Sequence, residues 1–207
     1  DALIKAVSEA NKRTAVVLMN GAPVAMPWIG SVGAVLEAYL GGQASGTAVS
    51  SLVLGDAVPS GKLAETFPLA LEDNPSYGNF PGDGSEVSYS EGTDVGYRHY
   101  DRLGKDVLFP FGHGLSYTSF GYSDLRYLGK DGEGRPAFSF RLENTGDFDG
   151  AEIAQLYVLG PESSERAAVK MLAGFSRVEV VKGGSFEVEL KADTEAFSCW
   201  DCSRNGW

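Results

Sequence analysis

Several residues in this sequence are of types that could do chemistry. Glu91 follows Tyr89 in a stretch rich in glycine and tyrosine, where a carboxylate could approach a ligand. The same carboxylate could instead pair with Arg98 or brace backbone amides, and we favour that interpretation. His113 could carry a proton, because histidine titrates near neutral pH. Its two flanking glycines favour instead a tight turn with the ring bonded to backbone.

Two further clusters resemble ligand or redox motifs. Asp147 and Asp149 have a faint calcium-loop pattern, but the twelve-residue ligand spacing is absent, which favours a solvated hairpin. Cys199 and Cys202 have C-x-x-C spacing, yet they lie at the edge of a predicted sheet rather than at a helix N-terminus. A zinc site would need two more ligands, and the chain has only two histidines. We therefore expect no metal and no cofactor, and either buried thiols or a local disulfide.

Composition places the chain among soluble globular proteins. Its 207 residues are 43% apolar and 22% charged, enough for a real hydrophobic core. A net charge of −11 disfavours nucleic acid and anionic membranes as partners. No apolar run approaches the ~20 residues of a membrane span. The chain opens on Asp1 without a basic leader, so we expect neither a signal peptide nor the start of the gene product, and the compartment stays open.

Residues 1–75 have the pattern of an α/β layer. The expected elements, in order, are a helix over 2–11, a buried strand at Thr14–Met19, an ambiguous stretch at Gly33–Leu40, a helix at Thr47–Leu54 and a strand at Leu63–Phe67. Alternating strands and helices indicate a partial parallel sheet. Because so small a sheet would leave its faces uncovered, we expect this segment to be the C-terminal part of a larger domain.

Residues 76–118 form the expected connector between two architectures. The first part is dense in glycine, serine, proline and aspartate, as loops are. The aromatic residues further on could stack on sugar rings or fill an interface core, and we favour the core. We expect Arg98, Phe111 and His113 to be structural residues at the junction. On that expectation, Phe111→Ala loosens the contact between the two parts.

Residues 119–207 alternate apolar and polar side chains in several short runs. Phe138, Phe140 and Leu142 form one such run, and glycine-rich turns separate it from the next. This pattern indicates an all-β, immunoglobulin-like antiparallel sandwich. A sandwich normally closes with another strand, so the irregular stretch at the end favours a domain lacking its last strand.

Four motifs together resemble the C-terminal part of glycoside hydrolase family 3, the β-glucosidases and their relatives. They are Gly-Asp-x-x-Pro-Ser-Gly-Lys-Leu-x-x-Thr-Phe-Pro ending at Pro68, Tyr89-Ser-Glu-Gly, Val95-Gly-Tyr-Arg-His-Tyr-Asp, and Pro110-Phe-Gly-His-Gly-Leu-Ser-Tyr-Thr. In the sandwich, Asn144-Thr-Gly and Gln155-Leu-Tyr-Val resemble the family's fibronectin type III-like domain. The resemblance covers nearly the whole chain in the right order. One departure is Ala44, where the family commonly has glutamate, so no ligand contact is carried over there.

The resemblance implies an architecture in which the chemistry lies elsewhere. The family combines a barrel bearing an aspartate nucleophile, an α/β sandwich domain and often the fibronectin type III-like module. Its acid/base carboxylate generally precedes the segment matched here. The implied activity is hydrolysis of terminal, non-reducing β-linked sugars with retention, and the implied partners are the barrel, the rest of the α/β domain and a carbohydrate substrate. Neither catalytic carboxylate is then expected in residues 1–207, although Tyr89 and Glu91 could lie near substrate.

Two other classes of function remain open on the sequence. The sandwich and the aromatic residues would also suit a non-catalytic carbohydrate-binding or adhesion module. A structural docking domain with no sugar role is the other alternative. The mass of the intact polypeptide distinguishes them, because the enzyme requires an additional barrel of ~250 residues.

Overall fold

The computed structural model describes residues 1–161, 169–201 and 203–206. The chain forms two compact units, and each is assembled from separate stretches of sequence. Unit 1 comprises Asp1–Ala57, Glu65–Ser90 and Asp106–Phe111, whereas unit 2 comprises Val58–Ala64, Glu91–Lys105 and Gly112–Trp207. The chain therefore passes from one unit to the other several times. The division into consecutive segments at 1–75, 76–118 and 119–207 stays a prediction.

Unit 1 is the mixed α/β part of the chain. Its elements are α1 (Ala2–Ala10), β1 (Ala15–Leu18), η1 (Ile29–Ser31), β2 (Ala34–Glu37), α2 (Ser45–Leu54), β3 (Phe67–Pro68), η2 (Leu71–Asp73) and β4 (Val107–Phe109). Strands β1 and β2 pair in parallel, with Ala15 opposite Ala34, which confirms the expected partial parallel sheet. Strand β3 pairs antiparallel with β4 and is shorter than expected, because it begins only at Phe67.

The end of helix α2 follows directly from its sequence. Gly55 adopts a left-handed conformation with φ of 82°, and its N–H donates to the carbonyl of Leu52. Glycine adopts this conformation without a Cβ penalty, so it terminates the helix where the sequence predicts. The turn that follows leads into the Val58–Ala64 stretch of unit 2.

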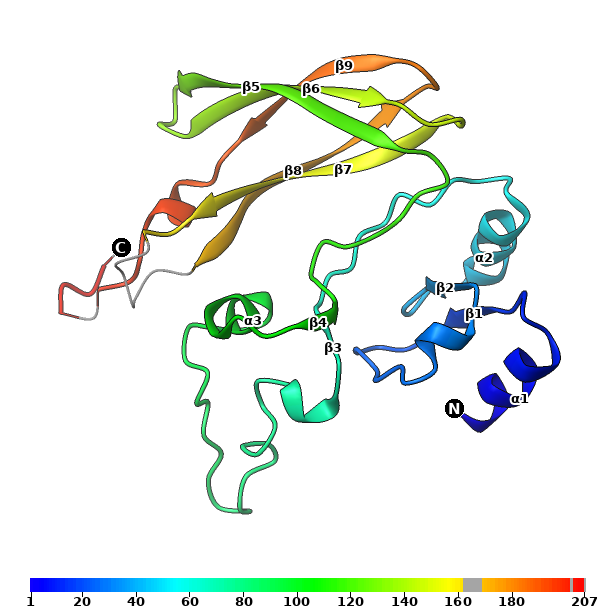
Figure 1. The fold of residues 1–207 in the computed structure, drawn as a ribbon. Helices are drawn as coiled ribbons and strands as arrows, with labels where there is room; N and C mark the ends of the chain where they lie inside the picture. Colours follow the sequence, from blue (N-terminus) through cyan, green and yellow to red (C-terminus); the bar gives the residue numbers. More distant parts are fainter. Residues whose placement is uncertain (162–168, 202, 207) are drawn as a thin grey trace. The chain divides into compact units, whose positions relative to one another are not determined.

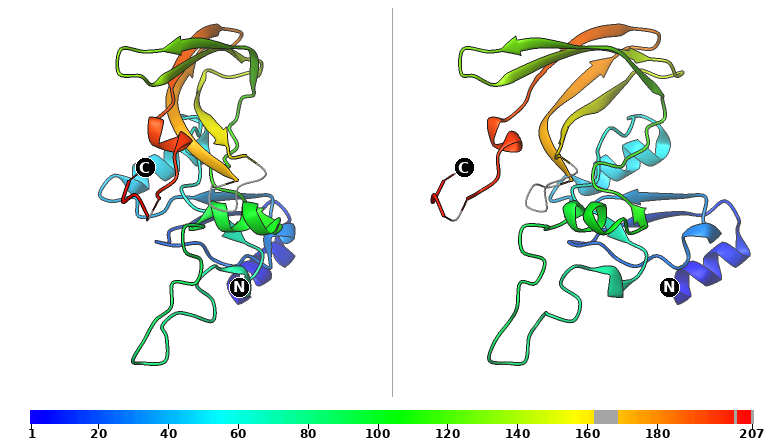
Figure 2. Two further views of the ribbon diagram at one scale, coloured as in Figure 1. Left: turned by 90° about the vertical axis from the view of Figure 1, so that its left-hand side faces the viewer. Right: turned by 60° about the vertical axis from the view of Figure 1, so that its left-hand side comes forward.

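Unit 2 is built on two antiparallel sheets. Its elements are α3 (Tyr97–Leu103), β5 (Phe120–Lys130), β6 (Pro136–Asn144), β7 (Gly150–Leu159), β8 (Lys170–Val180), β9 (Ser185–Lys191) and η3 (Thr194–Phe197). One sheet has the order β5-β6-β9 and the other pairs β7 with β8. The two sheets lie face to face in Figure 1 and in both views of Figure 2. This arrangement confirms the expected all-β sandwich.

Apolar side chains from both sheets fill the space between them. The core cluster consists of Phe140, Leu142, Ala154, Val180, Val188 and Leu190, with Phe120, Leu156 and Val178 packed against it. On β6 and β9 these residues alternate with exposed polar ones, as a half-buried strand requires. Phe140 and Leu142 of the run predicted from the sequence lie in this core, whereas Phe138 is only half-buried.

Asn144 closes one end of the sandwich from within. It is fully buried, and its Nδ2 donates to the carbonyls of Phe148 and Val180, at 2.8 Å each. Its Oδ1 accepts from the Thr118 hydroxyl at 2.6 Å and from the Gly146 N–H at 3.1 Å. The Asn144 amide thus donates two hydrogen bonds and accepts two inside the protein, as the burial of a polar group requires.

Helix α3 was not expected from the sequence. It begins after Gly96 (φ 62°) and ends at Gly104 (φ 59°), two glycines with positive φ. The seven residues between them mix aromatic and charged side chains without an apolar periodicity, so their pattern predicts a loop.

Among the residues that the structure describes, no helix has the length and apolar character needed to cross a membrane.

We predict that Asn144→Ala lowers the free energy of unfolding by about 3 kcal/mol, because several buried groups lose their partner at once. Urea unfolding followed by circular dichroism measures the change. Thr145→Ala, at the exposed neighbouring position, is the matched control and should leave the midpoint nearly unchanged. Equal midpoints for the two variants would show that the Asn144 amide does not stabilise the sandwich.

Candidate functional site

The glycines around His113 bring the chain unusually close to the Gly61–Leu63 stretch of the same unit. The Leu63 N–H donates to the His113 carbonyl and the Gly112 N–H donates to the Leu63 carbonyl, both at 2.8 Å. These two bonds pair the stretches side by side in unit 2. We refer to Gly112–Gly114 as the strap.

Neither strap glycine leaves room for a side chain. A Cβ on Gly114 would lie 2.3 Å from the Gly61 carbonyl oxygen, and a Cβ on Gly112 would lie 2.2 Å from Gln155 Oε1. Gly112 also has φ of 80°, which side-chain-bearing residues rarely adopt. The Gly-His-Gly pattern is therefore explained by close packing and by the turn that the sequence predicts.

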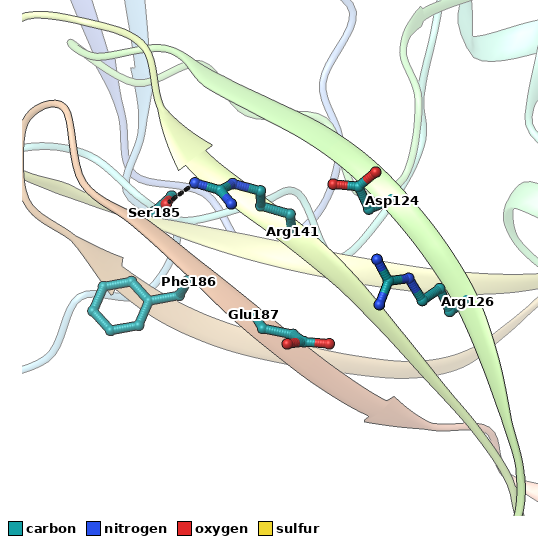
Figure 3. Close-up of a pocket in the computed structure, with 6 residues that line it drawn as sticks. All are labelled: Asp124, Arg126, Arg141, Ser185, Phe186 and Glu187. Atoms are coloured by element: carbon teal, nitrogen blue, oxygen red, sulfur yellow. Dashed lines mark hydrogen bonds between the residues drawn. The ribbon is translucent and has the colours of Figure 1, made fainter.

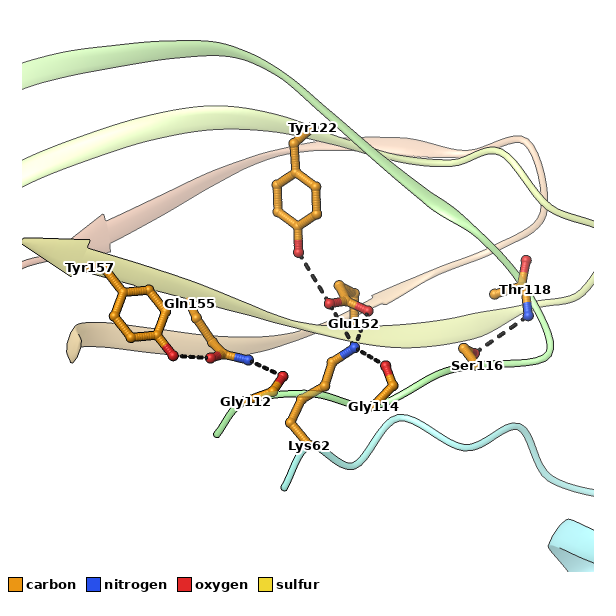
Figure 4. A network of polar contacts seen from close by, with 9 residues as sticks. All are labelled: Lys62, Gly112, Gly114, Ser116, Thr118, Tyr122, Glu152, Gln155 and Tyr157. Carbon is orange, nitrogen blue, oxygen red and sulfur yellow. Dashed lines mark hydrogen bonds and ion pairs between the residues drawn. The ribbon is translucent and has the colours of Figure 1, made fainter. Parts of the chain in front are cut away.

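Polar side chains of strand β7 hold the strap in place. Gln155 Nε2 donates to the Gly112 carbonyl at 3.0 Å, and Gln155 Oε1 accepts from the Tyr157 hydroxyl at 2.6 Å (Figure 4). Burial, followed by electrostatic interaction with Tyr97 and Asp101, raises the pKa of Tyr157 to about 12. Tyr157 is therefore a stable hydrogen-bond donor at neutral pH.

A largely buried ion pair lies next to the strap. Lys62 Nζ is 3.1 Å from each carboxylate oxygen of Glu152, and it also donates to the Gly114 carbonyl at 2.8 Å. The two side chains are only 14% and 12% exposed. The Tyr122 hydroxyl donates to Glu152 Oε1 at 3.2 Å (Figure 4). Burial and then the Glu152 charge raise the pKa of Tyr122 well above its ordinary value.

This arrangement positions the backbone rather than offering a reactive group. An ammonium group has three donors, and Lys62 directs its donors to the two carboxylate oxygens and the Gly114 carbonyl. A charged lysine engaged in this way is neither a base nor a nucleophile. The Glu152 carboxylate is likewise bonded to Lys62 and Tyr122. Sequence analysis singled out neither Lys62 nor Glu152, although Lys62 lies in the Pro-Ser-Gly-Lys-Leu motif.

His113 has the environment of a neutral histidine. Burial, followed by the positive charge of Lys62, lowers the pKa of its imidazole below the ordinary value. The residue is half-buried, and its backbone carbonyl pairs with Leu63 as described above. The tight backbone approach agrees with the structural interpretation of this histidine. Its place at a junction between domains stays a prediction.

The loop that contains Tyr89 and Glu91 is held by a different ion pair from the one expected. Tyr89 is 79% exposed and belongs to unit 1, while Glu91 belongs to unit 2 and accepts a backbone bond from Asp94. Within the described residues no ion pair joins Glu91 to Arg98, whose Nε instead lies 3.5 Å from the Val95 carbonyl. The role of Tyr89 and Glu91 near substrate stays a prediction.

The ion pair that does form in this segment joins Arg102 to Asp94. The Arg102 Nε donates to one carboxylate oxygen, and its second contact, to the other oxygen, is 3.2 Å. Arg102 lies on α3, so the pair ties the end of the loop to the helix that follows. This bidentate geometry was not anticipated, because Asp94 and Arg102 are eight residues apart in a stretch expected to be irregular.

Helix α3 is anchored to the sandwich by aromatic and charged groups of the same unit. The Tyr97 hydroxyl accepts from the Leu172 N–H at 2.9 Å, and its ring meets the Tyr157 ring edge-on at 6.3 Å. Lys170 Nζ lies 5.2 Å from the Tyr157 ring centroid and 3.3 Å from the Asp101 carboxylate. Tyr97 thus packs against the sandwich, in line with the structural role favoured for the aromatic residues of this segment.

Phe111, expected at the junction together with Arg98 and His113, belongs to unit 1. Its N–H donates to the Thr66 hydroxyl at 3.1 Å, and Thr66 is itself buried. This bond fixes the last residue before the strap to the segment that precedes β3. The expected loss of contact between domains in Phe111→Ala stays a prediction.

The remaining sequence candidates have other roles or fall outside the described residues. Asp147 pairs with Lys182 Nζ at 2.8 Å, and this hydrogen bond and charge lower the pKa of the Asp147 carboxyl. Asp149 accepts from the Lys182 N–H at 2.8 Å. The expected hairpin is wrong, because the loop bearing both aspartates joins β6 and β7, which lie in different sheets, and it is bonded to the turn between β8 and β9. Across the described ranges, His, Cys, Asp and Glu side chains form no group of three that could hold a metal. Cys199 is exposed, and Cys202 lies outside the described residues.

Comparison with known proteins identifies the family. The model of the glycosyl hydrolase family 3 C-terminal domain matches residues 1–117, and that of the fibronectin type III-like domain matches residues 152–207. The chain therefore belongs to glycosyl hydrolase family 3, in agreement with the resemblance seen in its motifs.

The similar proteins are β-glucosidases. The chain is 49% identical to thermostable beta-glucosidase B of Acetivibrio thermocellus over 99% of its own length, and 41% identical to probable beta-glucosidase I of Aspergillus clavatus over 100%. Among solved structures, a β-glucosidase of Streptomyces venezuelae in complex with D-glucose has a TM-score of 0.93 at 36% identity, covering 100% of this chain and 27% of that one. The β-glucosidase of Bifidobacterium adolescentis has a TM-score of 0.92 at 40% identity, covering 100% and 31%.

The whole chain is matched, but it corresponds to only part of each relative. The chain spans 27% of the Acetivibrio protein and 26% of the Aspergillus protein. It is thus homologous to the C-terminal part of family 3 β-glucosidases. The structural neighbours show the same proportion, so about a quarter to a third of each relative corresponds to this chain.

We predict that Lys62→Met lowers the free energy of unfolding by about 3 kcal/mol, because it leaves the Glu152 carboxylate buried without its counter-charge. The double variant Lys62→Met/Glu152→Leu should recover most of the loss, since it removes the unpaired charge as well. Urea unfolding of both variants measures the difference. As a control, Arg177→Ala breaks an exposed pair with Glu179 and should cost less than about 1 kcal/mol. A Lys62→Met variant as stable as the control contradicts the assignment.

We predict that His113 makes stability decrease as the pH falls below about 6.5. The folded-state pKa is depressed, so between that value and the ordinary one the unfolded chain binds more protons. The contribution of His113 is fully present above the unfolded pKa and is lost as the pH drops through the folded pKa. Thermal unfolding between pH 7.5 and pH 5, with His113→Asn compared against His99→Asn, should show a shallower dependence in His113→Asn alone. The same slope in both variants would overturn the prediction.

Proposed function

We propose that this chain is the C-terminal portion of a retaining β-glucosidase that hydrolyses terminal, non-reducing β-linked sugars. The observation that carries the proposal is the end-to-end match to β-glucosidases, 49% identical over 99% of the chain. Both family models match in the order that the resemblance implies, the hydrolase C-terminal domain first and the fibronectin type III-like domain second. The proposed substrate class is that of the relatives.

In this proposal residues 1–207 supply scaffold rather than the catalytic pair. Retention requires a nucleophile and an acid/base carboxylate about 5–5.5 Å apart across the scissile bond. The carboxylate beside the strap, Glu152, is largely buried, and its oxygens are bonded to Lys62 and Tyr122. This engagement supports placing both catalytic carboxylates in the part of the relatives that this chain does not span.

The surface of unit 1 supports the proposal that further polypeptide packs on it. Parallel sheets normally have both faces covered, yet every residue of β1 and β2 is exposed or only half-buried. Leu3 and Leu54 are 77% and 74% exposed, and Leu40 is 81% exposed. The proposed partners of these apolar side chains are the rest of the α/β domain and the barrel that bears the nucleophile.

We predict that the isolated 207-residue chain does not hydrolyse 4-nitrophenyl β-glucoside, because both carboxylates are proposed to lie elsewhere. Release of nitrophenol is followed by absorbance, with buffer as the blank. The matched positive control is the same chain joined to the coding segment that precedes it, which should gain β-glucosidase activity.

Two outcomes would reject the proposal. Turnover by the isolated chain that persists through stringent purification would place the catalytic groups inside residues 1–207. A natural polypeptide of only this mass would instead favour a carbohydrate-binding module or a docking domain, since no barrel of ~250 residues would then be present.

A further inference from the structure

The outer face of the β5-β6-β9 sheet carries a shallow concavity that the proposed hydrolysis does not use. Its volume is about 190 Å³, and it is lined by Asp124, Arg126, Arg141, Ser185, Phe186 and Glu187 (Figure 3). Arg141 and Glu187 alternate along their strands with buried Leu142 and Val188, so they project from the side opposite the core. The concavity is therefore separate from the strap and from the sandwich interior.

Strand register and a bulge assemble this surface. Arg141 on β6 lies directly opposite Glu187 on β9. On β5 the register shifts between Ser123 and Arg126, and Asp124 within the shift has φ of 57°. A bulge redirects the side chains next to it, and Figure 3 shows Asp124 and Arg126 both reaching from β5 toward β6. Aspartate tolerates a positive φ better than most residues, so Asp124 suits the bulge.

The charged groups that line the concavity do not pair with one another. Among the described residues no ion pair within 4.0 Å joins any two of its four charged side chains, although two are guanidinium groups and two are carboxylates. The Arg141 guanidinium is oriented by one bond to the Ser185 hydroxyl, at 2.7 Å. The site therefore retains both donors and acceptors for a ligand.

The balance of charge selects the chemistry of that ligand. A simple anion would meet two carboxylates and a simple cation two guanidinium groups, so neither is favoured. A sugar hydroxyl both donates and accepts, and a pyranose ring directs such groups to several sides at once. A volume of about 190 Å³ lies below the ~300–1,000 Å³ of pockets for drug-sized ligands, and it suits one sugar ring. The Phe186 ring points away from the Glu187 carboxylate in Figure 3, so recognition depends on hydrogen bonds.

We propose that the concavity formed by Asp124, Arg126, Arg141 and Glu187 binds a saccharide unit. The inference goes beyond the proposed hydrolysis, because it concerns a second sugar site on the sandwich and does not require the catalytic part of the enzyme. Its role is to hold a glycan by one sugar unit while the rest of the glycan remains free. An open site with few contacts implies weak binding, with Kd of about 1–10 mM.

The test is a titration of the ¹⁵N-labelled 207-residue chain with cellobiose, followed by amide chemical shifts. We expect saturable shifts of residues on β5, β6 and β9 around the concavity. Glu187→Gln and Arg141→Ala should each weaken binding about tenfold, because each removes a charge-assisted hydrogen bond. Arg141→Lys, which keeps the charge but loses the planar fork, serves as a second variant should Arg141→Ala not fold. Glu189→Gln, an exposed carboxylate on the same strand outside the concavity, is the matched control and should bind as the wild-type chain does.

Three results would overturn the proposal. The first is the absence of saturable shifts up to about 50 mM cellobiose, well above the expected Kd. The second is equal binding by the wild type, Glu187→Gln and Glu189→Gln. The third is saturation of the same residues by glycine but not by cellobiose, which would assign the site to a zwitterion. Because none of these results involves hydrolysis, the outcome is independent of the test of the proposed function.

Discussion

The largely buried charge pair between Lys62 and Glu152 is the interaction on which much of unit 2 depends. Transferring two charges out of water is expensive, and the cost is offset only when both ions find enough hydrogen bonds. Here the ammonium reaches two carboxylate oxygens and a carbonyl, and the carboxylate also accepts from Tyr122. The pair fixes a short stretch from early in the chain against strand β7. Gly114 of the strap fits this arrangement, because a Cβ there would collide with the Gly61 carbonyl oxygen and contact the Lys62 side chain.

The sequence predicts those features that arise from local patterns. Alternating apolar residues locate the strands of the sandwich, and Gly55 marks the end of α2, because burial and left-handed backbone leave a direct imprint on residue type. A partial parallel sheet is also predicted, but Gly33–Leu40, which contains β2, stays ambiguous in sequence, so the pairing of β1 with β2 comes from the structure alone. Helix α3 escapes prediction, since its stability comes from contacts of Tyr97 and Asp101 with residues about 70 positions later rather than from its own periodicity.

The candidate sites divide in the same way. His113 could be placed in a tight turn from its glycine neighbours alone, but its depressed pKa depends on burial near Lys62. Glu91 and Arg98 are close in sequence and of opposite charge, yet the ion pair forms between Asp94 and Arg102. Which of these side chains come into contact depends on the helix that contains Arg98 and Arg102, and that helix is not predicted from the sequence. The outer concavity is invisible to motif analysis. It exists because a bulge at Asp124 and the register of three strands bring four unremarkable surface charges together.

The interleaved composition of unit 2 has a consequence for biosynthesis. Lys62 and Glu152 are 90 residues apart in the chain, so the early stretch must wait for its partner to leave the ribosome. At about 5–20 residues per second, that interval lasts roughly 5–20 s. During this interval, Lys62 and the Gly61–Leu63 backbone can contact only solvent or other nascent segments. Synthesis rate and chaperone access through this window therefore bear on the yield of native protein.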